Sequence, residues 1–215
     1  MCDENKLDGR EQEALLAALQ RRAEIDEKRG HATFRHADNS TQPWMEVDTV
    51  RDWSTEMNRR GFQIDMGSIR KNSDAYPDCL AEMSGRTFGV EVTELVDREA
   101  IREYGRLRRA AGSEWDPLGS PGPPVPIWDL DSFRSRLDEI TLNKDARVRD
   151  SSLVKQFLLI HTDEPWLCEE TVSGYLQAVK LKRPKHFDQV YLMLSPVPNG
   201  SGNRRCPVFE VPLED

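Results

Sequence analysis

Two carboxylates are positioned to act together in a short predicted hairpin. Ser84-Gly85 is a turn dipeptide with alternating apolar residues on both sides, which predicts two strands around a two-residue loop. In that register Asp78 faces Glu91 across the strands, with the two Cβ atoms about 5 Å apart. A three-residue loop would shift the pairing by one and bring Asp78 opposite Val92.

The paired carboxylates predict one of two environments. Two like charges at this distance repel each other and are costly to desolvate, and a bound Mg²⁺ or Mn²⁺ ion would relieve that cost. The alternative is a solvated pair at the edge of the sheet, partnered by arginines. The opposite face of the hairpin forms a plausible core surface. It carries Cys79, Ala81, Met83, Phe88, Val90 and Val92.

The hairpin resembles the signature of the PD-(D/E)xK nuclease superfamily. Pro77-Asp78 matches its first part, and Glu91-Val92-Thr93 matches its acid-x-Lys triplet with threonine in place of lysine. With the flanking elements, the resemblance spans residues 46–195. It implies a restriction-endonuclease-like mixed sheet flanked by helices. It also implies that Asp78 and Glu91 bind Mg²⁺ or Mn²⁺ and that the enzyme cuts phosphodiester bonds.

A lysine on a later helix could replace the missing one. Residues 129–146 predict a helix capped by Asp129 or Asp131, and Lys144 continues its apolar stripe. That stripe consists of Leu130, Phe133, Leu137 and Ile140. A lysine in this position usually extends its ammonium to water. The resemblance implies the alternative, because some branches of the superfamily place their catalytic lysine on the helix, and Lys144 would then join Asp78 and Glu91.

Two further groups of residues are candidates for the site. Glu46 lies on the buried stripe of a helix predicted over 46–60, and the resemblance implies a metal-side acid there; a helix-dipole role is the alternative. Arg98, Arg102 and Arg106 repeat every four residues in a helix predicted over 97–111. They could contact the phosphates of nucleic acid, with DNA expected, or form a solvated face with ion pairs.

The remaining patterns predict an α/β (α+β) fold. We expect an N-terminal helical extension over 1–43, a domain over 44–215 and a Pro/Gly-rich exposed loop at 111–128. Phe62–Ile69 is expected to be a strand followed by a polar turn at 70–74. Further strands are expected over 153–161, 190–194 and, at an edge, 208–211, with a helix over 165–182.

Composition narrows the functional class. The chain has 215 residues, 32% of them charged, and a formal net charge of −8. These values and the absence of an apolar run of ~20 residues predict a soluble protein that does not span a membrane. Four scattered cysteines predict a reducing, cytoplasmic location, with neither a disulfide framework nor a zinc site. The N-terminal helix could pack on the domain, on a second copy in a homodimer or in a larger assembly, or it could be a solvated appendage.

Two functions follow from these observations. The first is a Mg²⁺-dependent endonuclease, in which Lys144 orients the attacking water or stabilises the pentavalent phosphate and Thr93 is at most a hydrogen-bonding accessory. The second is a catalytically inactive nuclease-like module that binds nucleic acid or a protein partner.

Overall fold

A mixed six-stranded sheet forms the centre of the protein, in the order β1-β2-β3-β4-β5-β8. The computed structural model describes residues 42–74, 76–97, 99, 106, 110, 128–148, 153–164, 166–198 and 204–214. The strands of this sheet are β1 (Ile64–Lys71), β2 (Cys79–Met83), β3 (Arg86–Glu94), β4 (Gln156–Thr162), β5 (Gln189–Leu194) and β8 (Val208–Glu210). Strands β3, β4 and β5 run parallel, while β1-β2, β2-β3 and β5-β8 pair antiparallel.

The predicted register of the β2-β3 hairpin is confirmed. Met83 pairs with Arg86 and Cys79 with Val90, so the loop is the two residues Ser84 and Gly85. Both have positive φ, 52° and 74°, which is the backbone of a type I′ turn and matches the twist of the flanking strands.

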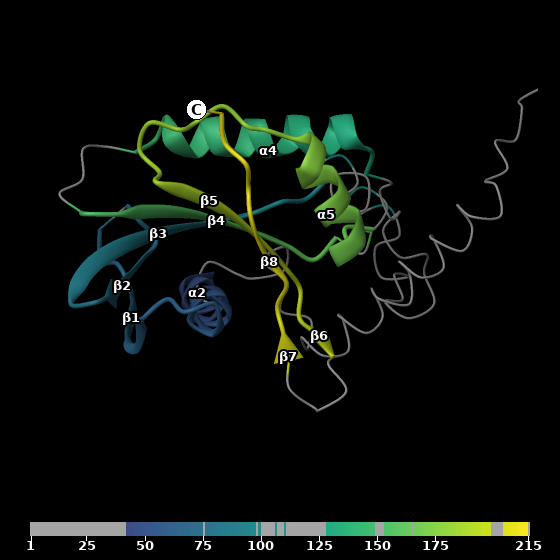
Figure 1. Cartoon of the computed structure of the whole chain (residues 1–215). Coiled ribbons are helices and arrows are strands. Elements are labelled where there is room, and N and C mark those ends of the chain that lie inside the picture. The colour runs from purple at the N-terminus through teal and green to yellow at the C-terminus, as the bar shows by residue number, and fades with distance from the viewer. Residues whose placement is uncertain are drawn as a thin grey trace, which may run out of the picture.

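Helices cover both faces of the sheet (Figure 1). Helix α2 (Gln42–Arg59) packs on one face, and α4 (Leu130–Asp145) and α5 (Glu169–Ala178) pack on the other. Strand β4 is buried along its whole length and serves both layers. Phe157 and Leu159 pack with Trp53 of α2, while Leu158 and Ile160 pack with the α4 and α5 layer. A mixed α/β fold is therefore confirmed.

Several predicted boundaries differ from the structure. β1 continues through Arg70 and Lys71, which we predicted to lie in a turn, because the ladder with β2 shifts register between Asp65 and Arg70 and then resumes. α5 is shorter than predicted, since Cys168 and Val179 at its ends have extended backbones. Leu130 is 36% exposed and does not join the buried stripe of α4.

The rest of the chain includes a small two-stranded sheet, β6 (Val197–Pro198) with β7 (Arg204–Arg205). The N-terminal extension lies outside the described residues apart from Gln42 and Pro43, which belong to α2. The predicted loop over 111–128 also lies outside them, apart from Trp128, which is buried. No helix in the described ranges has the length and apolar character that crossing a membrane requires.

Candidate functional site

Asp78 and Glu91 meet beside the β2-β3 ladder. Asp78 immediately precedes β2, and its backbone N–H donates to Glu91 Oε2 over 3.2 Å. Its own carboxylate accepts from the backbone N–H of Val92, with 2.9 Å between Val92 N and Asp78 Oδ2. Each carboxylate is thus held by a main-chain donor from the segment that carries the other, which fixes both at one place on the sheet.

Lys144 reaches this pair from the last turn of α4. Its Nζ atom lies 2.5 Å from Glu91 Oε1 and 3.1 Å from the Val92 carbonyl oxygen. The helix begins at Asp129 in a capping box with Ser132, and its buried residues Phe133, Leu137 and Ile140 fix its face against the sheet. The sequence spacing that placed Lys144 on this stripe therefore also brings its ammonium to Glu91.

Glu91 is the more deeply buried acid of this pair, with 9% of its side chain exposed. Burial raises its pKa, and the nearby charge of Asp78 raises it further, while the ammonium of Lys144 opposes both effects. The ammonium of Lys144 thus favours the ionised form of this carboxylate. A cation bound at this position would have the same stabilising effect.

Lys71 is a second ammonium that the sequence interpretation did not include. It ends β1, lies 3.4 Å from Asp78 Oδ1 and also contacts the carboxylate of Glu46 on α2. Burial by itself lowers the pKa of Lys71, but the hydrogen bond to Glu46 and the charges of Asp78 and Glu46 outweigh it, so the net shift is upward. We predicted that Lys71 lies in a turn, whereas it pairs with Cys79 in the ladder of β1 with β2, next to Asp78.

We name these five residues the carboxylate-lysine cluster. It contains the acids Glu46, Asp78 and Glu91 and the bases Lys71 and Lys144. Three negative charges face two positive charges, which leaves the cluster with a formal charge of −1. Lys71 joins Glu46 to the cluster, because its ammonium contacts the carboxylates of both Glu46 and Asp78.

A buried polar network holds the segment that carries Asp78. Asn72 donates its side-chain amide to the Tyr76 carbonyl, and its backbone N–H donates to the Asp78 carbonyl. The Tyr76 hydroxyl donates to Gln156 Oε1 over 2.6 Å, which ties the segment to the start of β4. Burial and the charge of Glu91 raise the pKa of Tyr76, so its hydroxyl keeps the proton that it donates.

The donor chemistry of the cluster suits a hard divalent cation. Asp78, Glu91 and the Val92 carbonyl supply oxygen atoms, which Mg²⁺ and Mn²⁺ prefer. Within the described part of the chain, no group of three or more His, Cys, Asp or Glu side chains is arranged to hold a metal ion. Mg²⁺ usually takes one or two protein carboxylates and completes its shell with water and substrate phosphate, so this donor set fits it.

The other predicted residues are only partly described. Thr93 is half-buried two residues after Glu91 on β3. Arg106 is helical and exposed, as predicted for that position, while Arg98 and Arg102 lie outside the described residues.

Comparisons with known proteins do not identify a family. A scan against protein-family models, a search of curated proteins and a search of solved structures each find no match for this chain.

Proposed function

We propose that this protein is a metal-dependent nuclease that hydrolyses phosphodiester bonds of nucleic acid, with DNA as the expected substrate. The observation that carries the proposal is the contact of Lys144 with Glu91 beside Asp78, because two acids and an ammonium converge from three separate elements. We further propose that the fold is restriction-endonuclease-like. The antiparallel β1-β2-β3 unit followed by parallel β4 and β5 supports this assignment.

The roles of the residues follow from their positions. Asp78 and Glu91 would bind Mg²⁺ or Mn²⁺, with the Val92 carbonyl as a third oxygen atom. The bound cation would activate a water molecule and neutralise charge that builds on the phosphate. Lys144 would hydrogen-bond that water or a non-bridging phosphate oxygen, and its ammonium would stabilise the developing negative charge.

The remaining groups would support this arrangement. Lys71 would share Asp78 with the cation and, being 36% exposed, would be able to turn toward solvent or toward a phosphate. The arginines predicted to contact phosphate, Arg98, Arg102 and Arg106, would hold the nucleic-acid backbone. Thr93 would be at most a hydrogen-bonding accessory.

Nuclease assays with near-isosteric variants test the proposal. Purified protein should nick or degrade plasmid DNA with Mg²⁺ or Mn²⁺ and should be inactive in EDTA. Asp78→Asn and Glu91→Gln should each lower the rate by roughly a hundredfold or more, because each removes a charged oxygen ligand. Asp74→Asn, at an exposed acid four residues from Asp78, is the matched control and should retain activity. Cleavage that survives in the Asp78→Asn/Glu91→Gln double variant would refute the assignment.

A second candidate is a nuclease-like module that binds nucleic acid or a protein partner without cutting. The observation in its favour is that Lys144 and Lys71 already neutralise most of the charge on the three acids. Titration with Mn²⁺ separates the candidates, since a ligand at 100 times its Kd stabilises the native state by about 2.7 kcal/mol. If the protein is a nuclease, Mn²⁺ should stabilise the wild type and raise its Tm, and it should not raise the Tm of the Asp78→Asn variant. A module without a metal site should show no rise in either protein.

A further inference from the structure

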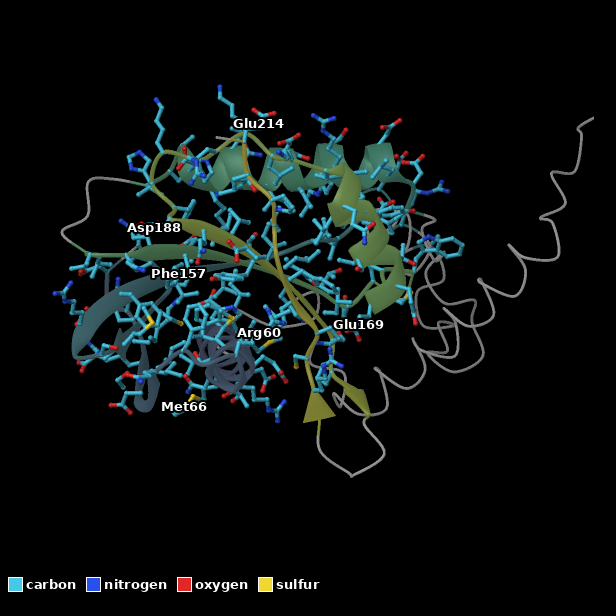
Figure 2. All side chains as sticks on the ribbon, viewed as in Figure 1. Arg60, Met66, Phe157, Glu169, Asp188 and Glu214 are labelled. Carbon is cyan, nitrogen blue, oxygen red and sulfur yellow. The ribbon has the colours of Figure 1, made fainter. Side chains whose placement is uncertain are left out.

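A cleft of about 620 Å³ lies beside the tip of the β2-β3 hairpin. Its walls come from the turn after α2, from the hairpin on both sides of Ser84, and from the chain that enters β4 at Val154 and Lys155. We call it the hairpin cleft. Figure 2 shows Arg60, one of its lining residues, on the α2 side of the sheet.

The hairpin cleft is positively charged. Arg60, Arg86 and Lys155 line it, all three are exposed, and none of the described residues that line it is acidic. Within the described part of the chain, none of these three side chains forms an ion pair, whereas Lys71 and Lys144 each contact a carboxylate. Three cations that gather without a counter-charge, in a chain with a net charge of −8, favour an anionic ligand.

Apolar side chains form another part of the cleft. Phe62 and Met83 are half-buried in its wall, and Val154 is 61% exposed. Proteins that bind single-stranded nucleic acid combine a cationic groove with aromatic and apolar surfaces on which bases stack. A peptide that consists of acidic residues alone would contact the cations but would leave this apolar surface without a partner.

The position of the cleft relates it to the carboxylate-lysine cluster. Arg86 begins β3, five residues before Glu91 on the same strand. At about 3.3 Å per residue the two positions are roughly 16 Å apart. Side chains alternate along a strand, so Arg86 lies on the α2 face with Phe88 and Val90, whereas Glu91 lies on the opposite face with Lys144. A segment of nucleic acid that occupies both places must therefore pass around the edge of the sheet.

We propose that the hairpin cleft binds a nucleotide of a single-stranded segment of the substrate, with phosphate at Arg86 and Lys155 and the base against Phe62 and Val154. The inference deepens the proposed nuclease function and rests on it for the identity of the ligand. It assigns these residues to substrate binding and not to the chemical step.

Binding of a fluorescein-labelled oligothymidylate in EDTA tests this assignment without cleavage. The Arg86→Gln/Lys155→Gln variant should bind roughly tenfold more weakly than the wild type at about 50 mM salt. The slope of log affinity against log salt should also become shallower by about 1.4. The variant leaves two phosphates without a cation, and each neutralised phosphate of a single strand contributes ~0.7 to that slope. The matched control is Lys180→Gln/Lys182→Gln, which removes two exposed charges elsewhere and should change neither quantity. Val154→Ser should weaken binding at unchanged salt slope.

Three results would overturn the assignment. One is equal weakening by the two double variants, which would mean a diffuse charge effect. Another is unchanged binding in the Arg86→Gln/Lys155→Gln variant. The third is competition by polyglutamate as effective as competition by unlabelled oligothymidylate, which would make the cleft a site for acidic polypeptide. The nuclease proposal is tested separately, because it is judged by metal-dependent cleavage in the Asp78→Asn variant, whereas the cleft is judged by binding in EDTA.

Discussion

Glu91 is the residue on which the chemistry of the cluster depends most. It is buried, accepts hydrogen bonds from Lys144 and from the backbone of Asp78, and has a raised pKa because burial and Asp78 disfavour its charge. A buried carboxylate whose charge is stabilised by an ammonium is costly to the fold when the ammonium is removed. This cost gives a stability measurement that is independent of catalysis.

Lys144→Met should destabilise the protein by about 2 kcal/mol at pH 8, because it leaves Glu91 buried without its ammonium. The folded-state pKa of Glu91 is already above its ordinary value and should rise further in the variant. The deficit should therefore be full above the pKa of Glu91 in the folded variant, and should vanish below its pKa in the folded wild type, where the carboxyl is protonated in both folded proteins. Urea denaturation in EDTA across this pH range measures it.

Arg134→Met is the control for this experiment. It also removes a positive charge from α4, but the Arg134 side chain is 53% exposed and its partner Asp138 is 32% exposed, so water can take the place of the guanidinium. We expect a smaller deficit with weaker pH dependence. Equal effects of the two variants at every pH would contradict the role assigned to the buried Glu91.

Among the elements, β3 determines how closely the segment with Asp78 approaches the sheet. Gly89 lies on this strand two residues before Glu91, and its backbone N–H donates to the Lys155 carbonyl at the entrance to β4. A Cβ atom at Gly89 would lie 2.5 Å from Pro77 Cγ and 2.8 Å from Leu153 Cδ1. Glycine is thus required here by the close packing of Pro77 over the strand, next to Asp78.

Gly89→Ala should destabilise the protein by about 1–3 kcal/mol, because the methyl group overpacks the contact with Pro77. It should also lower nuclease activity, since Asp78 must move with Pro77. Gly174→Ala in α5 is the matched control, because no atom lies within 4 Å of the place that its methyl group would take and alanine favours the helix by about 1 kcal/mol. Thermal unfolding of both variants gives the comparison, and a neutral Gly89→Ala would show that the Pro77 contact is not tight.

At the scale of the whole molecule, one sheet supports two apolar layers. The α2 layer contains Trp53, Phe88 and Phe157, and the opposite layer contains Phe133, Leu137 and Leu158. Successive residues of β4 enter opposite layers because side chains alternate along a strand. The carboxylate-lysine cluster draws Glu46 and Lys144 from helices on opposite faces, so both layers must be folded for it to form.

Leu158→Ala and Leu159→Ala should each destabilise the protein by about 2–5 kcal/mol, because both leucines are fully buried and each deletion leaves a cavity. Since the two layers share β4, each variant should unfold in a single transition. Far-UV circular dichroism and tryptophan fluorescence should then give coincident denaturation curves. Separate transitions in either variant would indicate that the layers fold independently.

The sequence alone determined the local geometry of the cluster. Alternation around Ser84-Gly85 sets the register of β2 with β3, because only the observed pairing buries Cys79, Ala81, Phe88 and Val90 together. The helical spacing of Phe133, Leu137 and Ile140 sets the face of α4 on which Lys144 lies. Both patterns operate within about twenty residues, and burial of apolar side chains enforces them directly.

Only the tertiary structure decided which residues from distant parts of the sequence lie next to the cluster. The register shift in β1 that precedes Lys71 is marked in the sequence only by Gly67, and the bond from Tyr76 to Gln156 joins residues 80 positions apart. The cations of the hairpin cleft come from three separate segments of the chain, and none of these segments has a basic cluster that would predict a binding site. Such contacts depend on how packed layers align in space, and local periodicity carries no information about that alignment.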